Sequence, residues 1–255
     1  MKEDLPVSKT LVAIPAHADD VELNAGGTVA KWAADGGKVH VIMMTDNCVG
    51  IRIAPEQCTA IRHAEQQASA ECYGGIVHYR MYSQRFYWDE QRCRLVTIGY
   101  ANAPPPPECF RDRLPLLIAA REPDQVESLA DQIIALRPDL VLTHTPLDLD
   151  PEHHAVTAMV WSVFQVRKKE LADTTLRYWM PGSSCQDGML PPSYDHFEDI
   201  SDYFDRKLEL FDCHKSQHSD LPWAMIKDRA AHFGRQIGVK HAEPFTTAMR
   251  NLRFG

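Results

Sequence analysis

Residues 10–29 read TLVAIPAHADDVELNAGGTV, and this stretch decides the class of fold. The apolar run at 11–16 has the length of a strand that is buried on both faces, and Pro15 indicates that the strand is ending there. From 21 to 34 the apolar residues recur at helical spacing, and two glycines end the pattern. A buried strand that leads directly into a helix is the opening unit of an α/β fold.

The same alternation continues along the chain. Further apolar runs of strand length lie at 39–45, 76–79, 139–145 and 175–180. Helical patterns cover about 56–73, 122–138, 153–171, 201–214 and 222–236, the tail reads as strand or loop, and most of 80–122 shows no clear pattern. This order predicts an α/β fold, a Rossmann-like three-layer sandwich around a mainly parallel sheet. No linker is long enough to divide the chain, so we expect a single domain over residues 1–255.

The composition narrows the classes of function. The chain has 255 residues, 44% of them apolar, which is enough to bury a sizeable core. Its formal net charge is −8 and it has no long basic run, so we expect no nucleic-acid partner. No apolar segment approaches the roughly 20 residues that span a bilayer, and the start, MKEDLPVSK, is not a secretory signal. Seven scattered cysteines form no C-x-x-C pair, which indicates reduced thiols and a cytoplasmic location.

The tip of the first strand carries three side chains with metal or proton chemistry. His17 offers an imidazole nitrogen and Asp20 a carboxylate oxygen, and zinc accepts both. Asp19 lies between them, and a carboxylate beside a metal can take a proton from an activated water. Alternatively, these acids only favour the start of the helix. Capping explains one acid, but it does not explain a histidine and two acids together.

A second acidic loop, DLDPEHH at 148–154, follows another apolar strand directly. The carboxyl ends of parallel strands meet at one edge of a sheet, so the two loops are expected to converge there. Together they would complete a three-ligand site with an open fourth position, which is typical of catalytic zinc. The alternative for this loop alone is a charged surface turn that opens a helix. Its chemistry does not choose between His153 and His154 as the ligand.

Five blocks of the sequence resemble, in order, the motifs of the LmbE-like (PIG-L) zinc-dependent N-deacetylases. The blocks are AHADDVELNAGGTVAKW (16–32), RHAEQQASAECYG (62–74), THTPLDLDPEHHAV (143–156), DRKLELFDCHKSQ (205–217) and HAEPF (241–245). The corresponding family motifs are A-H-P-D-D-x-E, R-x-x-E, H-x-P-x-D-x-H-P-D-H, K…H-x-S-Q and A-E-x-F. The resemblance spans nearly the whole chain. It implies a hydrolase that removes the acetyl group from an N-acetylated amino sugar, such as an N-acetylglucosamine derivative, or from its glycoside. Family members often form homo-oligomers.

The resemblance also implies roles for individual residues. It makes His17, Asp20 and His153 the ligands of a zinc ion. It makes Asp19 the general base that activates the water and later protonates the leaving amine. The family's proline in the first motif is Ala18 here, a change that is expected to loosen the turn.

Four further residues are candidates for contact with the sugar. Arg62 matches a family residue that is associated with substrate hydroxyls, although an ion pair with Glu65 or another acid is an equal alternative. His214 is a candidate by the same kind of match, but a cation near a helix end is favourable on its own. Asp46 follows the second strand and either contacts the substrate or forms a turn. The fourth candidate is His154.

Asp150 is the main departure from the family. It takes the place of a histidine that stabilises the oxyanion, and an ionised carboxylate would repel that charge. Asp150 could be protonated, another donor such as His154, His214 or Tyr178 could replace it, or zinc alone could carry the charge. Asp150 could also position a substrate or a histidine in an altered site. An amidase acting on a thiol-sugar conjugate or another amide, and a non-catalytic sugar- or metal-binding protein, are therefore the alternative functions.

Overall fold

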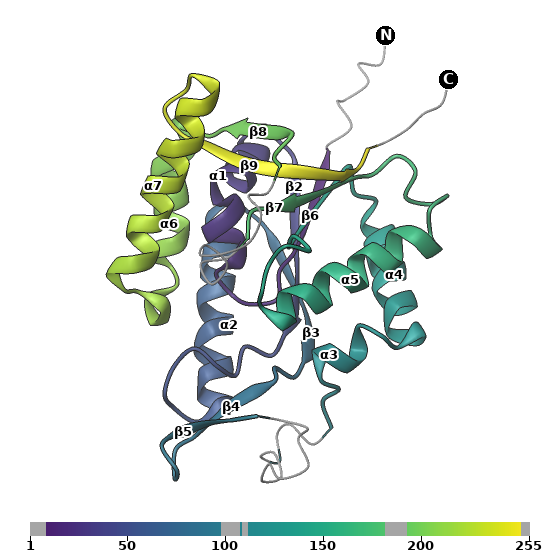
Figure 1. Ribbon diagram of the computed structural model, residues 1–255, viewed down its shortest axis with the longest axis vertical. Coiled ribbons are helices and arrows are strands. Elements are labelled where there is room, and N and C mark those ends of the chain that lie inside the picture. Colours follow the sequence, from purple (N-terminus) through teal and green to yellow (C-terminus); the bar gives the residue numbers. More distant parts are fainter. Residues whose placement is uncertain (1–8, 98–107, 109–111, 182–192, 251–255) are drawn as a thin grey trace.

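A seven-stranded sheet forms the centre of the computed structural model, which describes residues 9–97, 108, 112–181 and 193–250 (Figure 1). The strand order is β3-β2-β1-β6-β7-β9-β8. These strands are β1 (Thr10–Ile14), β2 (Lys38–Thr45), β3 (Ile76–Tyr82), β6 (Leu140–Thr143), β7 (Thr175–Trp179), β8 (His196–Asp199) and β9 (Ala242–Met249). The first five in this order pair in parallel, whereas β9 is antiparallel to both β7 and β8. The predicted α/β fold with a mainly parallel sheet is confirmed.

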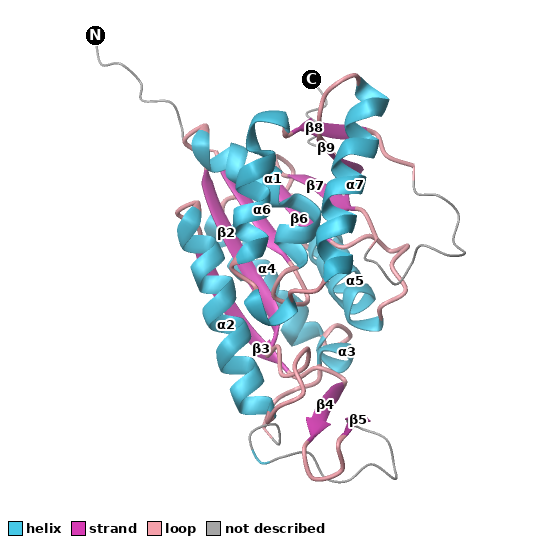
Figure 2. Cartoon of the chain, turned by 90° about the vertical axis from the view of Figure 1, so that its left-hand side faces the viewer, coloured by secondary structure: helices cyan, strands magenta, loops and turns pink. Residues whose placement is uncertain are grey.

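Helices cover both faces of this sheet and complete the predicted three-layer sandwich (Figure 1 and Figure 2). One face carries α1 (Asp20–Ala34), α2 (Pro55–Cys72) and α6 (Phe204–Asp212), with α7 (Asp220–Ile237) packed against α6 and β9. The other face carries α3 (Leu116–Ala119), α4 (Pro123–Leu136) and α5 (Pro151–Val166). None of the described helices is long and apolar enough to cross a membrane.

The burial of β1 explains its uninterrupted apolar sequence. Leu11 and Ala13 pack with the helix α1 on one face, and Val12 and Ile14 pack with α4 and α5 on the other. All four side chains are completely buried. A strand with helices on both faces has no solvent side, so polar residues are excluded until the strand ends. The first polar side chains therefore appear together at its carboxyl end.

Short elements account for most differences from the sequence prediction. The stretch without a clear pattern contains α3 and an antiparallel hairpin of β4 (Phe86–Asp89) and β5 (Arg94–Thr97). The tail forms the strand β9, and its partner β8 was not predicted. These segments are mostly four residues long, which is too short for periodicity to identify them. The helix predicted at 153–171 begins at Pro151 and ends at Val166.

The helix α1 is broken in the middle by a buried ion pair. Ala25 has φ −140° and ψ 15°, which are not helical values. Past this break, Glu243 accepts hydrogen bonds from the backbone N–H groups of Gly27 and Thr28 at 2.9 and 2.8 Å. Before it, Lys207 Nζ donates to the carbonyl oxygen of Leu23 at 2.9 Å and also contacts Glu243. The pair therefore satisfies the backbone groups that the break leaves free on both sides.

Candidate metal centre

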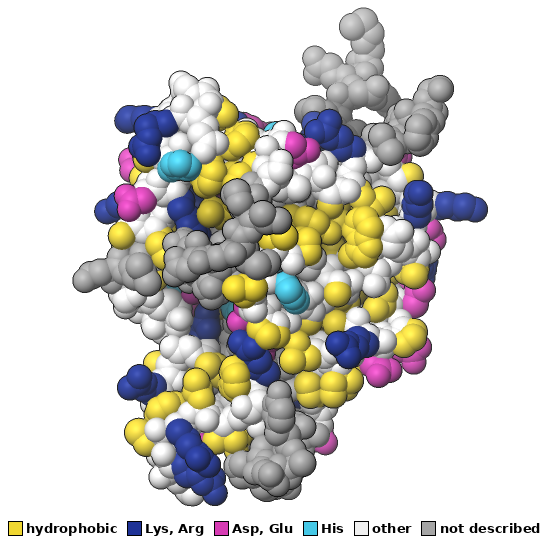
Figure 3. All heavy atoms as spheres, viewed as in Figure 1, with side chains coloured by type: hydrophobic (Ala, Val, Ile, Leu, Met, Phe, Trp, Pro, Cys, Tyr) yellow, Lys and Arg dark blue, Asp and Glu magenta, His cyan; other side chains and the backbone are white. Residues whose placement is uncertain are grey.

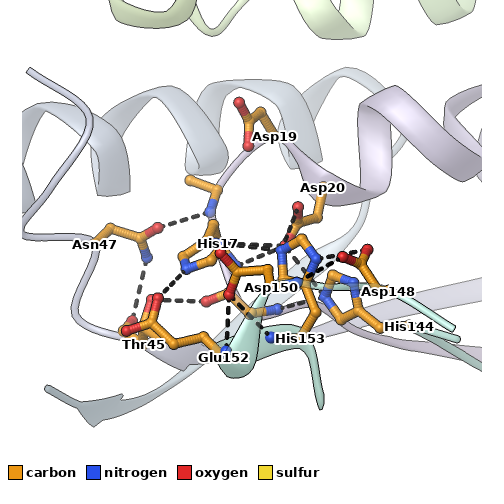
Figure 4. A network of polar contacts seen from close by, with 12 residues as sticks. His17, Asp19, Asp20, Thr45, Asn47, His144, Asp148, Asp150, Glu152 and His153 are labelled. Atoms are coloured by element: carbon orange, nitrogen blue, oxygen red, sulfur yellow. Dashed lines mark hydrogen bonds and ion pairs between the residues drawn. The ribbon is translucent and has the colours of Figure 1, made fainter. Parts of the chain in front are cut away.

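Two loops meet at the carboxyl edge of the sheet. The strands β1 and β6 pair in parallel up to Ile14 and Thr143, so the loops that follow them start side by side. The loop after β1 carries His17 and leads into α1. The loop after β6 leads into α5, which places His153 in the first turn of that helix. Figure 4 shows the resulting group of side chains.

Three ligand atoms converge in this group. The Nδ1 atom of His17 lies 3.1 Å from Nε2 of His153, which in turn lies 3.5 Å from Oδ1 of Asp20. The Nδ1 atom of His17 is 3.7 Å from Oδ2 of Asp20. Ligands at about 2.0–2.2 Å from one tetrahedral zinc ion are about 3.3 Å apart, so the spacing fits a single ion. The structure thus brings together the three residues that the sequence predicted as metal ligands.

In each of the two histidines, the ring nitrogen that points away from the ligand group contacts a carboxylate. The Nε2 atom of His17 lies 2.7 Å from Oε2 of Glu152, and Nδ1 of His153 lies 2.8 Å from Oδ2 of Asp148. Such contacts place the ring proton on the outer nitrogen and leave the inner nitrogen free to bind a metal. Burial alone would lower the pKa of His153, but the charges of Asp20 and Asp148 raise it to about 9. Metal binding at neutral pH would therefore displace a proton from this ring.

Asp20 is held in its ionised form by the surrounding rings. Burial by itself would raise its pKa, but the charge of the nearby His153 and the hydrogen bond with His144 lower it. His144 Nε2 lies 3.2 Å from Oδ2 of Asp20, and Trp179 Nε1 donates a hydrogen bond to His144 Nδ1 at 3.2 Å. Burial lowers the pKa of His144 to about 4, so this ring is neutral at pH 7. A neutral His144 ring can orient the Asp20 carboxylate by a hydrogen bond and leaves the negative charge of Asp20 available to a metal ion.

Asp19 lies on the same turn, but its carboxylate does not join the ligand group. Its φ of 94° is in the left-handed region, which turns the side chain away from Asp20 (Figure 4). Arg62 Nη2 contacts Oδ1 of Asp19 at 3.3 Å. Burial raises the pKa of Asp19 to about 6, although Arg62 opposes the shift. A carboxyl group with such a pKa can accept and release a proton near neutrality.

The four predicted substrate contacts lie in different surroundings. Arg62 is buried, donates to backbone carbonyl oxygens of Val49 and Ala18, and is paired with Asp19 rather than with Glu65. The other buried pairs are Asp46 with Arg113 at 2.9 Å and His214 with Glu22 at 3.2 Å.

His154, in contrast, is on the exposed side of α5. It lines an apolar surface groove of about 590 Å³ with Trp161 and Tyr178. Figure 3 shows that apolar side chains gather over α5 on this face. His154 and Tyr178 therefore face a surface that the sequence prediction did not identify.

Asp150 is the N-cap of α5. Its Oδ1 atom accepts hydrogen bonds from the backbone N–H groups of Glu152 at 2.7 Å and His153 at 3.4 Å. Its Oδ2 atom pairs with Nη2 of Arg85 at 3.1 Å. The cap holds the turn that carries His153, and this contact supports the predicted role of Asp150 in positioning a histidine.

Asp148, Glu152 and His144 support the ligand group, yet sequence reasoning gave them no role. The available signal was their position, because His144 and Asp148 lie in the loop that leads to α5 and Glu152 precedes His153 in the first turn of that helix. The spacing alone does not show which acid faces which ring. That depends on the turn between β6 and α5, where Asp150 N–H donates to Asp148 at 3.0 Å.

Asp148→Asn is expected to weaken metal binding about 10- to 100-fold, because it removes the charge that holds the His153 ring. Competition with a metal-binding dye measures this affinity directly. Asp131→Asn is the matched control, since Asp131 lies on α4, is 69% exposed and forms a surface ion pair with Arg167. An unchanged affinity in Asp148→Asn would show that the His153 ring is positioned without this carboxylate.

Known proteins share both this sequence pattern and this fold. The family model described as PIG-L, GlcNAc-PI de-N-acetylase, matches residues 12–164. A 1D-myo-inositol 2-acetamido-2-deoxy-alpha-D-glucopyranoside deacetylase of Actinosynnema mirum is 25% identical over 243 residues, which cover 81% of this chain and 80% of the relative. An N,N'-diacetylchitobiose deacetylase of Pyrococcus horikoshii has a TM-score of 0.69 at 19% identity, covering 97% of this chain and 86% of that one. A conserved protein of Thermus thermophilus has a TM-score of 0.70 at 21% identity, covering 96% and 97%.

The family match includes both loops of the candidate metal centre. It covers His17, Asp20 and His153. The Actinosynnema mirum and Pyrococcus horikoshii proteins are named as deacetylases, which are hydrolases of N-acetyl amide bonds. The match extends over more than half of the chain, and the resemblance seen in the sequence is confirmed: this protein belongs to the PIG-L family of GlcNAc-PI de-N-acetylases.

Proposed function

We propose that the chain is a zinc-dependent deacetylase that releases acetate from an N-acetylated amino sugar or its glycoside. The observation that carries this proposal is the convergence of ligand atoms from His17, Asp20 and His153 beside the unligated Asp19. Two imidazole nitrogens and one carboxylate oxygen are a donor set that zinc accepts in catalytic sites. The deacetylase of Actinosynnema mirum, whose named substrate is a 2-acetamido sugar linked to inositol, supports this class of substrate.

The metal would supply Lewis acidity and lower the pKa of water at the centre. Asp19 takes the proton from the attacking water on its carboxylate. It then delivers this proton to the nitrogen of the leaving amine, so that the amide C–N bond breaks to give a neutral amine and acetic acid, which then releases its proton to become acetate. Arg62 orients Asp19, because its guanidinium is anchored by the carbonyl oxygens of Val49 and Ala18.

The predicted substrate residues divide into two kinds. Three of them, Arg62, Asp46 and His214, are buried and already form ion pairs. We therefore propose that they shape the wall of the site and set its charge, and do not bind the substrate directly. His154 is exposed, and we assign it to a peripheral part of the substrate such as an aglycone in the apolar groove. Aromatic side chains such as Trp161 commonly pack on sugars or apolar groups in such grooves.

The protein purified without added metal is expected to contain about one zinc ion per chain, because the two groups of possible ligands at this centre, His17–Asp20–His153 and His144–Asp148–His153, share His153. Removal of the metal by a chelator should abolish acetate release from N-acetylglucosamine glycosides, and added zinc should restore it. Elemental analysis and an enzymatic acetate assay measure the two quantities. Bound metal without acetate release from any N-acetyl sugar would favour a non-catalytic protein, and release of a different acid would favour another amidase. Absence of a tightly bound transition metal would refute the ligand assignment.

A further inference from the structure

Arg85 is a cation beside the metal centre that the sequence prediction did not identify. It ends the short loop after β3 and directly precedes β4. Its backbone N–H donates to Oε1 of Glu152 at 2.6 Å, while Oε2 of the same carboxylate contacts His17 at 2.7 Å. Its guanidinium contacts Oδ2 of Asp150, which caps the turn of His153. Arg85 is therefore connected to each ligand histidine through one carboxylate, to His17 through Glu152 and to His153 through Asp150.

The guanidinium of Arg85 is fixed in position. The ion pair with Asp150 measures 3.1 Å, and the guanidinium carbon lies 4.7 Å from the centre of the Phe86 ring. A planar guanidinium that is stacked and paired in this way loses little further freedom when it binds a ligand. The side chain is still 26% exposed, so part of it is accessible to a ligand.

Arg85 also retains unused hydrogen-bond donors. Its Nε atom is buried and has no hydrogen-bond partner among the described residues. Among the described residues, the Arg85 side chain forms one hydrogen bond, in which Nη2 donates to Asp150. The Nη1 group of Arg85 likewise has no partner among the described residues, whereas Arg62 gives both terminal nitrogens to backbone carbonyl oxygens. Because the Arg85 side chain is partly exposed, its terminal Nη1 donor can reach a ligand oxygen.

We propose that Arg85 is a catalytic residue that binds the acyl oxygen of the substrate while this oxygen carries negative charge. The inference rests on the proposed deacetylation. When water adds to the acyl carbon, the electron pair of the C=O bond moves to oxygen, and the Arg85 donors stabilise it there. The pair returns when the C–N bond breaks and the amine takes its proton from Asp19. Asp150, which is an acceptor only, positions Arg85 and makes no contact with the oxyanion.

Arg85→Ala is expected to lower kcat for acetate release about 100-fold, the usual effect of losing one such donor, with KM changed less than about threefold. Acetate, the product that carries the same oxygen, should bind at least about tenfold more weakly, as measured by saturation-transfer NMR on metal-loaded and metal-free protein. Arg85→Lys should retain part of the kcat and part of the acetate affinity, because lysine keeps the positive charge but lacks the planar set of donors of a guanidinium. Arg167→Ala, at the other end of α5, is the matched control and should change neither.

The metal content and the melting temperature of each variant separate catalysis from folding. If Arg85→Ala keeps kcat, or loses kcat only in proportion to lost metal, the assignment of Arg85 is wrong even though deacetylation stands. If the wild-type protein releases no acetate, the proposed function fails. The comparison of acetate binding to the wild type and to Arg85→Ala then tests whether Arg85 binds an acyl oxygen. Acetate that binds Arg85→Ala as well as wild type, or that binds neither, overturns the inference.

Discussion

Asp19→Asn is expected to retain its fold and its metal but to lose acetate release by a factor of about 10² to 10⁴, the usual contribution of a general acid–base group. The carboxylate of Asp19 contacts Arg62 and is not part of the ligand group, so its replacement leaves the metal site complete. Asparagine tolerates the positive φ of this position well, so the turn should keep its shape. An amide cannot accept the proton of the attacking water, and turnover stops for that reason.

Elemental analysis, thermal unfolding and an acetate assay test this result together. Asp35→Asn is the matched control, because Asp35 is an exposed acid at the opposite end of α1. We expect wild-type turnover for this control. Loss of metal in Asp19→Asn would make Asp19 a ligand, and undiminished turnover would assign the base to another residue.

Lys207→Met is expected to reduce the free energy of unfolding by about 3–5 kcal/mol, because it leaves the Glu243 carboxylate buried without its cation. Both side chains are only 3% exposed, so water cannot compensate for the lost charge. The double variant Lys207→Met/Glu243→Gln should lose less than the sum of the single changes, since it removes both charges. Urea unfolding of the metal-free protein measures these differences.

A surface pair provides the control for the Lys207 prediction. Lys31 and Glu198 form an ion pair with side chains that are 32% and 24% exposed. Lys31→Met should therefore cost less than about 1 kcal/mol, as exposed pairs generally do. Equal losses for Lys31→Met and Lys207→Met would mean that burial does not determine the strength of the Lys207–Glu243 pair.

The core of the fold could be predicted from sequence because its signals are local. The apolar run of β1 is continuous because every residue from Leu11 to Ile14 is buried, and such a pattern is visible without the structure. The hairpin of β4 and β5 gave no such signal, since four-residue strands are shorter than the windows that periodicity requires. The strand β8 was missed for the same reason.

The metal centre could be predicted in part. His17, Asp20 and His153 stand out because they follow buried strands whose ends must meet. Which carboxylate faces which ring could not be predicted, because Asp148 in the loop and Glu152 at the start of α5 are four residues apart and contact different histidines. The ion pair of Asp150 with Arg85 joins segments that are far apart in the chain, and no local pattern encodes it.

The break in α1 has a consequence for how the protein is made. The three ligands lie within the first 153 residues, but the carboxylate that satisfies the N–H groups of Gly27 and Thr28 belongs to Glu243. These groups are 216 and 215 residues apart in the chain. The first helix therefore reaches its final hydrogen bonding only after β9 has been synthesised and has paired with the sheet.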